Sequence, residues 1–582
     1  MAGQSRKWMI LVATIWIQAF TGTNFDFSSY SSDLKSVLGI SQVQLNYLAT
    51  ASDLGKALGW SSGLALLYFP LWVVLFMAAG MGLVGYGFQW LVIQNLISLP
   101  YFLEVESQNM AFIYQNSKNR RTSYIMTKAA GCSICWFNTV CFVLCIKNFP
   151  TNRALALSLT ISFNGVSPAL YTLIANAISS TDSSSLYLVL NSLVPLVTSF
   201  AALIPILRQP PLEPLSTEAA RRDSLIFLLL NILAVFTGLY LLFFNSISSS
   251  AYTARLLFSG AILLLVFPLG IPGIVFAREW ARRTIHTSFR LEGSGFNLVE
   301  VDDLELHKEL LGRENYNDNG NGDVGYNVAE KEGCCEKAIV KDQLTVLGEE
   351  HPAHLLIRRC DFWLYYVAYF CGGTIGLVYS NNLGQIAQSL GNSPKATTLV
   401  TLYSSCSFFG RLLSAAPDFM RGKVYFARTG WLAIALVPTP IAFFLLAASG
   451  KPIALQIGTA LIGLSSGFIF SAAVSITSEL FGPNSVGVNH NIMITNIPIG
   501  SMLYGLLAAI VYDSNVGPSM GKLAIIKDGA MVCMGRQCYK ETFVWWACIS
   551  ILGLASSVLL FLRTRQAYDR FERNRKMAQL LY

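Results

Sequence analysis

The sequence consists largely of apolar stretches about as long as a membrane is thick. The first follows Arg6 and Lys7 and runs from Trp8 to about Phe20, and similar stretches recur along the chain. A helix needs about 20 apolar residues to cross the hydrocarbon core of a bilayer. Only 13% of the residues are charged, against roughly 25% in a soluble domain. The chain is therefore predicted to be all-α, multi-pass and mostly in lipid.

The predicted spans fall into groups of six, two and six, and a count of twelve stays open if the middle pair is peripheral or one span is divided wrongly. The predicted divisions are a six-helix bundle at 8–207, a linker with two extra spans at 208–280, a disordered loop at 281–358, a second six-helix bundle at 359–565 and a tail at 566–582. The loop is charged and contains a Gly- and Asn-rich tract, a composition that does not bury a core.

Most of the cations outside the spans gather in loops of one side, although the topology puts the four cations of Glu104–Lys128 on the other side. Arg208, Arg222, Arg358 and Arg563 all follow or precede spans on that side, as does the basic tail. Cytoplasmic loops of membrane proteins carry such an excess of Lys and Arg. Both termini and the loop at 281–358 are therefore predicted to be cytosolic. The net charge of +8 reflects this bias, so the expected surroundings are membrane lipid and no nucleic acid.

Residues 8–60 recur in weak form at 363–415. Each copy has an apolar helix, a polar loop and a second apolar helix that ends in glycine and a cation, Gly55–Lys56 in the first and Gly410–Arg411 in the second. Parallel repeats of this kind form the two halves of many transporters. The repeat predicts two related bundles.

Between the third and fourth predicted spans, Glu104–Lys128 is polar and carries four cations. The offset between the repeats falls from about 355 residues before this segment to about 332 after it, so the first half carries the surplus. One interpretation is an inserted loop, and the other is an altered segment, for example from a changed splice, that replaced the start of the fourth span. In both cases the segment is expected to be poorly ordered.

The glycine and the cation at the end of each second helix suggest a conformational gate. Glycine lets two helices approach closely, and Asp and Arg in the following loop can pair across helix ends. The alternatives are ordinary positive charge on the cytosolic side and, for Lys56, a structural ion pair with Asp53. The gate hypothesis covers Gly55, Lys56, Gly410, Arg411, Asp418 and Arg421.

Polar side chains within the spans are candidates for a solute site. Asn164 aligns with Asn496, and Pro168 and Pro498 follow them. An Asn in mid-membrane needs a partner, which is a neighbouring helix, water or a solute, so interhelical hydrogen bonding is the alternative. The predicted site consists of Gln18, Asn24, Asn164, Tyr366, Tyr369, His490, Asn491 and Asn496.

The sequence contains no pattern typical of catalysis. It has no P-loop, no HExxH and no nucleophile elbow, which favours a protein that is not an enzyme and has no cofactor. Cys132 and Cys135 lack the second ligand pair of a zinc site. Cys533 and Cys538 share a polar loop predicted to lie outside the cytosol, where a local disulfide and free thiols are both open.

Three segments carry a resemblance that covers nearly the whole chain. They are WMILVATIWIQAFTGTNFDFSSYSSDLKSVLGIS at the start, CWFNTVCFVLCIKNFPTNR, and RQPPLEP. Together they resemble the plant nodulin-like proteins of the major facilitator superfamily, although the family continues apolar where Glu104–Lys128 is polar. The resemblance implies two six-helix bundles that transport an unidentified small solute or ion, and it carries over no binding residues. It also implies a part in karyogamy, the fusion of polar nuclei in the female gametophyte, with a non-transporting membrane scaffold as the alternative.

Overall fold

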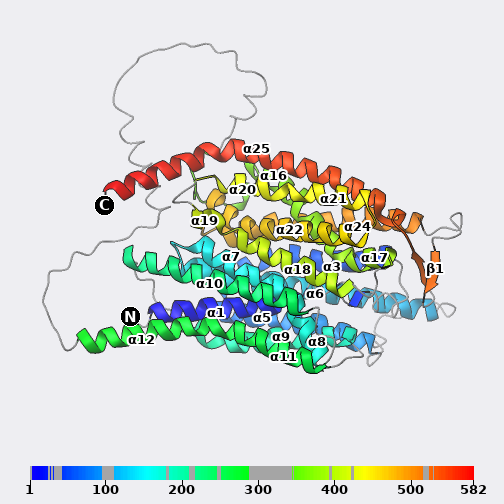
Figure 1. The fold of residues 1–582 in the computed structure, drawn as a ribbon, viewed down its shortest axis with the longest axis horizontal. Helices are drawn as coiled ribbons and strands as arrows, with labels where there is room; N and C mark the ends of the chain where they lie inside the picture. Colours follow the sequence, from blue (N-terminus) through cyan, green and yellow to red (C-terminus); the bar gives the residue numbers. More distant parts are fainter. Residues whose placement is uncertain are drawn as a thin grey trace, which may run out of the picture.

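The structure of the chain is a computed structural model. It describes residues 3–23, 27, 30–31, 42–94, 111–178, 183–208, 217–245, 251–286, 344, 346–391, 396–420, 425–515, 524–527 and 530–581. The described part is almost entirely helical, and most helices run roughly along one long axis (Figure 1). The two ends of the chain lie at the same end of the bundle (Figure 1), which we call the terminal face. The other end is the opposite face.

The helices fall into three sets along the chain. The first comprises α1 (Gly3–Thr21), α3 (Gln42–Ala57), α4 (Trp60–Tyr68), α5 (Leu71–Ile93), α6 (Ala111–Asn148), α7 (Arg153–Phe163), the turn η2 (Asn164–Val166), α8 (Ser167–Ile178) and α9 (Ser183–Leu207). The second comprises α10 (Thr217–Asn245), α11 (Ala251–Val266), η3 (Phe267–Leu269) and α12 (Gly270–His286).

The third set forms the second half of the bundle. It comprises α15 (Ala353–Leu356), α16 (Cys360–Tyr369), the π-helical turn η4 (Phe370–Thr374), α17 (Ile375–Ser389), α18 (Ala396–Leu413), α19 (Ala416–Met420), α20 (Arg428–Leu436), α21 (Pro438–Ala448), α22 (Pro452–Phe481), α23 (Val486–Met493), α24 (Asn496–Ser514) and α25 (Gln537–Leu581). A short antiparallel hairpin of β1 (Ala524–Lys527) and β2 (Ala530–Cys533) precedes α25.

Eleven helical stretches of the described chain are long and apolar enough to cross a membrane. Helices α1, α3 and α18 pack among them, and with these three the predicted spans are all present in order. The prediction of an all-α, multi-pass chain is confirmed. The pair formed by α10 and α11–α12 lies along the first half, where α11 packs on α8 and α12 on α1, while α10 also reaches α18 of the second half.

Each half contains a helix crossing in which glycine packs directly against the backbone of the neighbouring helix. These two crossings reveal the repeat. A Cβ on Gly55 of α3 would lie 2.0 Å from the carbonyl oxygen of Lys128, and one on Gly131 of α6 would lie 1.8 Å from that of Ser52. Real Cβ atoms do not approach other atoms this closely, so only glycine permits the contact between α3 and α6.

Helices α18 and α22 cross in the same way in the second half. A Cβ on Gly410 would lie 2.0 Å from the carbonyl oxygen of Leu464, and one on Gly467 would lie 2.0 Å from that of Ser407. Gly410 and Ser407 of α18 stand 355 positions after Gly55 and Ser52 of α3. Gly467 and Leu464 of α22 stand 336 positions after Gly131 and Lys128 of α6. The two halves therefore share one helix crossing.

Several spans are broken near their middle. Helix α7 gives way to α8 through η2, because Pro168 has no N–H to donate to the carbonyl of Asn164. Likewise α23 ends at Met493 and α24 begins at Asn496, two residues before Pro498. Broken helices lining a cavity are typical of transporters.

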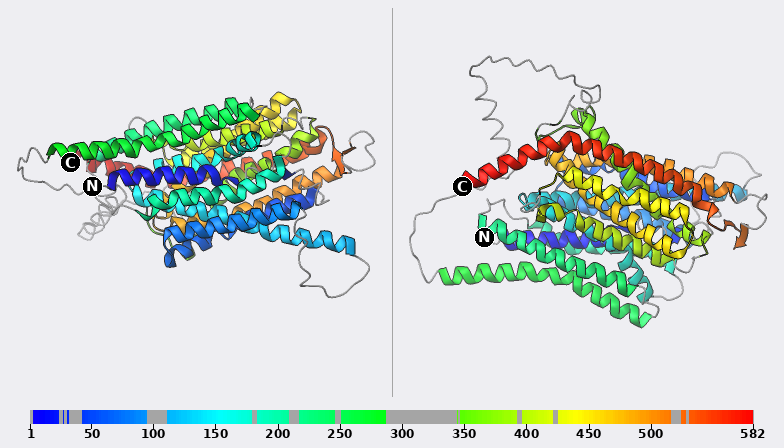
Figure 2. Two further views of the ribbon diagram at one scale, coloured as in Figure 1. Left: turned by 90° about the horizontal axis from the view of Figure 1, so that it is seen from below. Right: turned by 45° about the horizontal axis from the view of Figure 1, so that its top comes forward.

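The polar segment at 104–128 differs from its prediction. Residues 111–128 are not disordered but form the first part of α6, a helix of 38 residues. Figure 2 shows this part, in light blue, extending beyond the other helices. Extending an existing helix is easier than starting one, so a stable span can propagate into a polar flank. Residues 104–110 lie outside the described residues, so the choice between an inserted loop and an altered segment stays open.

The predicted loop and tail are also shorter than expected. Helix α12 continues to His286, and residues 346–359 pack on the second half, with Leu347 and Leu356 buried. The amide of Gly348 donates to the carbonyl of Glu479 at 2.7 Å. Residues 287–343 lie outside the described residues. The predicted tail at 566–582 is the end of α25 up to Leu581, with Tyr568 and Phe571 buried.

Candidate functional site

A small cavity lies between the two halves, near the middle of the spans. Its volume is about 100 Å³, and we call it the central cavity. Its polar lining comprises Gln18 of α1, Lys56 of α3, Asn138 of α6 and Asn164 of η2 from the first half, and Tyr369 of α16, Arg411 of α18 and His490 of α23 from the second. Both halves therefore contribute polar groups to one space.

Arg411 joins the halves at this cavity. Its Nη1 donates to the carbonyl of Ile161 at 3.1 Å and to Oδ1 of Asn164 at 3.3 Å. Arg411 is 2% exposed and Asn164 is 7% exposed. Nδ2 of Asn164 has no hydrogen-bond partner among the described residues. The broken helix at η2 thus presents an amide donor to the cavity.

Gln18 and Asn138 form a second polar pair on the wall. Nε2 of Gln18 donates to Oδ1 of Asn138 at 2.9 Å. Asn138 was not among the predicted site residues, although an amide within the apolar run of α6 carries the same signal that pointed to Asn164. A search for every amide inside a span would have found it.

Lys56 forms a buried ion pair with Asp53, at 2.5 Å between Nζ and Oδ1. The second oxygen of Asp53 accepts a hydrogen bond from the hydroxyl of Ser501 on α24. This contact joins the first half to the second. Toward the opposite face, Nε2 of Gln385 donates to the hydroxyl of Ser31 at 3.4 Å and joins the halves again.

The gate hypothesis places Lys56 and Arg411 wrongly. It treats both as helix ends near the cytosolic loops, yet both line the central cavity. The spans continue past the predicted ends, because α4 extends the second span to Tyr68 and α19 extends the tenth to Met420. Gly55 and Gly410 lie at the helix crossings described above. Arg421 lies outside the described residues.

Of the remaining predicted site residues, some line the central cavity and others do not. Tyr369 and His490 line the central cavity. Asn496 is 0% exposed, accepts a hydrogen bond from Thr374 at 3.0 Å and does not line that cavity. The Tyr366 hydroxyl meets that of Thr495 at 3.3 Å, and Nδ2 of Asn491 donates to the carbonyl of Gly487 on its own helix at 2.6 Å. Asn24 lies outside the described residues.

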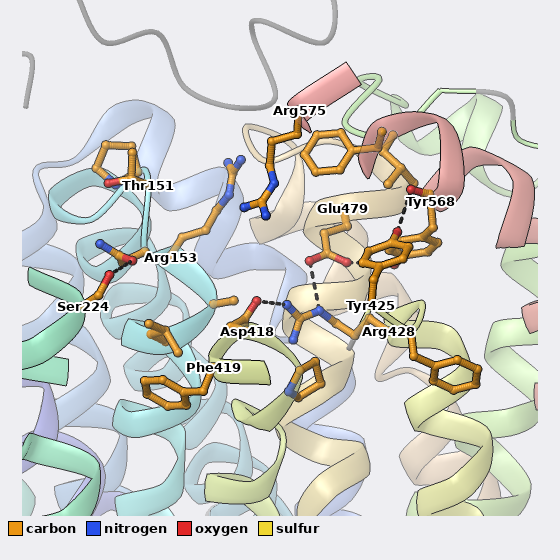
Figure 3. Close-up of a pocket in the computed structure, with 18 residues that line it drawn as sticks. Thr151, Arg153, Ser224, Asp418, Phe419, Tyr425, Arg428, Glu479, Tyr568 and Arg575 are labelled. Carbon is orange, nitrogen blue, oxygen red and sulfur yellow. Dashed lines mark hydrogen bonds and ion pairs between the residues drawn. The ribbon is translucent and has the colours of Figure 1, made fainter. Parts of the chain in front are cut away.

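A larger cavity of about 390 Å³ opens at the terminal face (Figure 3). In Figure 3, Thr151, Arg153 and Ser224 of the first half and the linker lie across from a charged cluster of the second half. In that cluster Arg428 bonds Asp418 at 2.7 Å and Glu479 at 2.9 Å.

The cluster joins four elements of the second half. The Tyr568 hydroxyl of α25 donates to Glu479 at 2.8 Å, while Asp418 lies on α19, Arg428 on α20 and Glu479 on α22. Asp418 therefore pairs with Arg428, the first residue of α20. The gate hypothesis did not include Arg428.

Cys533 and Cys538 are joined by a disulfide between the end of β2 and the first turn of α25. Both cysteines are 0% exposed. This hairpin lies near the opposite face (Figure 1).

The chain has the fold of major facilitator transporters. The structure of the xylose transporter XylE from E. coli in a partially occluded inward-open conformation superposes with a TM-score of 0.51, over 95% of this chain and 97% of that chain. The two sequences are 11% identical, so the likeness shows the fold alone.

The family follows from sequence comparison. Residues 7–273 match the family described as Nodulin-like, and residues 345–570 match the one described as NFD4, C-terminal domain. The chain is 58% identical to Protein NUCLEAR FUSION DEFECTIVE 4 of Arabidopsis thaliana over 578 residues, which are 99% of this chain and 92% of that protein. It is also 29% identical over 195 residues to a probable transporter, MCH1, of Yarrowia lipolytica, covering 31% of this chain and 38% of that one. The chain belongs to the nodulin-like family, which confirms the predicted resemblance.

Proposed function

We propose that this chain is a secondary transporter that carries a small solute or ion through the central cavity as its two halves rock against each other. The observation that carries the proposal is a central cavity to which both halves contribute polar side chains. Asn164 Nδ2 and His490 Nδ1 lack partners among the described residues. Buried polar groups without partners are costly, and a solute in the cavity would satisfy them.

The positions of the cavities support an alternating-access cycle. The cavity of about 390 Å³ opens between residues of the two halves at the terminal face. Beyond the central cavity, hydrogen bonds from Ser501 to Asp53 and from Gln385 to Ser31 hold the halves together. This arrangement corresponds to a state open at the terminal face and closed at the opposite face.

The proposed transporter has a defined orientation in the membrane and two halves that move. The terminal face is cytosolic, because Arg153, Arg428 and Arg575 line its cavity and the cytosolic side of membrane proteins carries an excess of Lys and Arg. The bundles at 8–207 and 359–565 are the two moving halves, and the linker at 208–280 carries a pair of helices alongside the first. A long cytosolic loop connects that pair to the second bundle.

The biological role comes from the relative. A 58% identical protein is named for a defect in nuclear fusion, so we assign this chain a part in nuclear fusion, that is, in karyogamy. Transport would then supply or remove a solute that fusion requires. A scaffold that does not transport is the alternative, and it would act independently of the central cavity.

The test is thermal unfolding of the purified full-length protein with sugars, amino acids, nucleotides and metal ions. A ligand that binds only the folded state at 100 times its Kd adds about 2.7 kcal/mol. Asn164→Ala should abolish the shift in unfolding temperature. Asn148→Ala is the matched control, since Asn148 bonds its own helix at 2.8 Å and does not line the central cavity.

The same two variants separate transport from a scaffold role in a plant lacking the endogenous protein. Rescue of nuclear fusion by Asn148→Ala but not by Asn164→Ala supports the transporter. Full rescue by a variant that binds no solute would favour the scaffold instead.

A further inference from the structure

The central cavity is positively charged. Two of its lining residues, Lys56 and Arg411, are cations, and no Asp or Glu is among its described lining residues. Asp53 is 1% exposed, lies behind Lys56 and pairs with it at 2.5 Å. Two positive charges and one negative charge leave the site with an excess of one positive charge.

The repeat gives each half one of these cations. Lys56 follows Gly55 and Arg411 follows Gly410, and these glycines hold the equivalent crossings of α3 with α6 and of α18 with α22. The backbone before each cation is therefore held against a neighbouring helix in the same way. The two charges meet from opposite halves at the place where alternating access requires the solute.

The guanidinium of Arg411 is held at the cavity wall by the bonds from its Nη1 to Ile161 and Asn164. Its planar fork of N–H donors matches the geometry of a carboxylate or similar oxyanion. Beside it, Asn164 is 7% exposed and its Nδ2 has no partner in the described part of the chain. His490 is 8% exposed and its Nδ1 likewise has none there. Acceptor oxygens would satisfy the amide of Asn164 and, in the tautomer protonated at Nδ1, the imidazole of His490.

We propose that the transported solute is a small oxyanion with one negative charge, bound by Arg411 and Lys56 in the central cavity. This inference rests on the proposed transport function and names its substrate class. A single negative charge would neutralise the excess charge of the site. A water needs roughly 10–15 Å³ of cavity volume, so a cavity of about 100 Å³ has room for roughly seven to ten water-sized groups. A small carboxylate or nitrate fits within this volume.

Three probes of nearly the same shape test the charge. Acetate, acetamide and acetamidinium are added to the purified full-length protein at constant ionic strength, and the shift in unfolding temperature is measured. Acetate should stabilise the protein, whereas acetamide and acetamidinium should not. Formate and nitrate then separate carboxylates from other planar oxyanions. This series uses the unaltered protein, so it does not depend on any variant folding.

Variants then locate the site. Arg411→Gln should weaken acetate binding at least tenfold, and Arg411→Lys should retain part of it. Lys451→Gln is the matched control, because Lys451 is an exposed cation in the loop before α22 and should bind acetate unchanged. Equal loss in Arg411→Gln and Lys451→Gln would show a general salt effect and overturn the inference.

Uptake into proteoliposomes distinguishes failure of the substrate class from failure of the proposed function. Uptake of a neutral or cationic solute that Asn164→Ala abolishes would overturn the oxyanion inference and leave the transporter standing. No uptake of acetate, formate, nitrate, neutral solutes or cations would overturn both. Saturable acetate uptake lost in Arg411→Gln and kept in Lys451→Gln is the expected result.

Discussion

At the scale of single residues, two buried ion pairs of the described spans join distant parts of the chain. Lys7 of α1 pairs with Asp223 of α10, and Arg563 of α25 pairs with Asp361 of α16 at 2.6 Å. A buried charge without a partner is costly. Sequence reasoning finds such charges, but it cannot match Asp361 with a partner 202 positions away.

Replacing Asp361 tests this pairing. Asp361→Asn leaves Arg563 buried without its counter-charge, so the free energy of unfolding should fall by about 3–5 kcal/mol. Asp569→Asn is the control, since its pair with Arg565 is 3.7 Å long with both side chains exposed, and such pairs contribute about 0–1 kcal/mol. Denaturant unfolding in detergent measures both. Equal losses would contradict the assigned role of burial.

At the scale of helices, each half contains one helix crossing that depends on glycine. The crossings at Gly131 and Gly467 bring backbone against backbone, so a single added methyl group must push two helices apart. Other glycines are not so constrained. Gly80 on α5 has no atom within 4 Å of an added Cβ.

This difference predicts opposite effects of one substitution. Gly131→Ala should destabilise the protein by about 1–3 kcal/mol, the usual effect of overpacking. Gly80→Ala should be neutral or stabilising by up to about 1 kcal/mol, because alanine suits a helix better than glycine. Thermal unfolding in detergent compares them. If both variants unfold alike, the close crossing of α3 and α6 is not present in solution.

The segment before α16 predicts a second effect at this scale. Glu350 accepts hydrogen bonds from the amides of Asn484 and Ser485, at 2.9 and 3.0 Å, just before α23. Glu350→Ala should therefore cost about 0.5–2 kcal/mol, as lost helix caps do. Glu349→Ala is the control, because the Glu349 side chain is exposed and only its carbonyl oxygen bonds His351. Equal unfolding temperatures of the two variants would contradict the capping role.

At the scale of the whole molecule, the spans and their order followed from hydropathy, because each span must be apolar along its own length. Their ends were harder to predict. Gly59 and Ser414 interrupt spans that resume as α4 and α19, so Lys56 and Arg411 were expected at a membrane surface but lie in the interior.

The candidate site was predicted only in part, for a related reason. Asn164 and Asn496 align in the repeat, yet Asn164 lines the central cavity whereas Asn496 bonds Thr374 inside its own half. Successive residues of a helix differ by about 100° in direction, so a small change in a broken helix turns a side chain away from the cavity. Spacing in the sequence does not record that rotation.

The long connection between the halves gives a prediction for the whole chain. Deletion of 291–340 should leave the unfolding temperature nearly unchanged, since it spares the segment packed on the second half. Deletion of 291–350 should lower it, because it removes the buried Leu347, the bond from Gly348 to Glu479 and the cap from Glu350. Equal unfolding temperatures would show that this segment does not hold the second half in place. Nuclear fusion lost in the shorter deletion, with solute binding intact, would favour the scaffold.

The contact of α10 with the second half has a consequence for the rocking motion. Helix α10 is tied to α1 by Lys7 and Asp223, yet it faces α18, where a Cβ on Gly238 would meet the ring of Phe408 at 2.5 Å. If the halves rock, this glycine must slide past an aromatic ring in every cycle. With glycine at this position no side chain has to pass the ring, so the inserted helix can stay in contact with α18 during the motion.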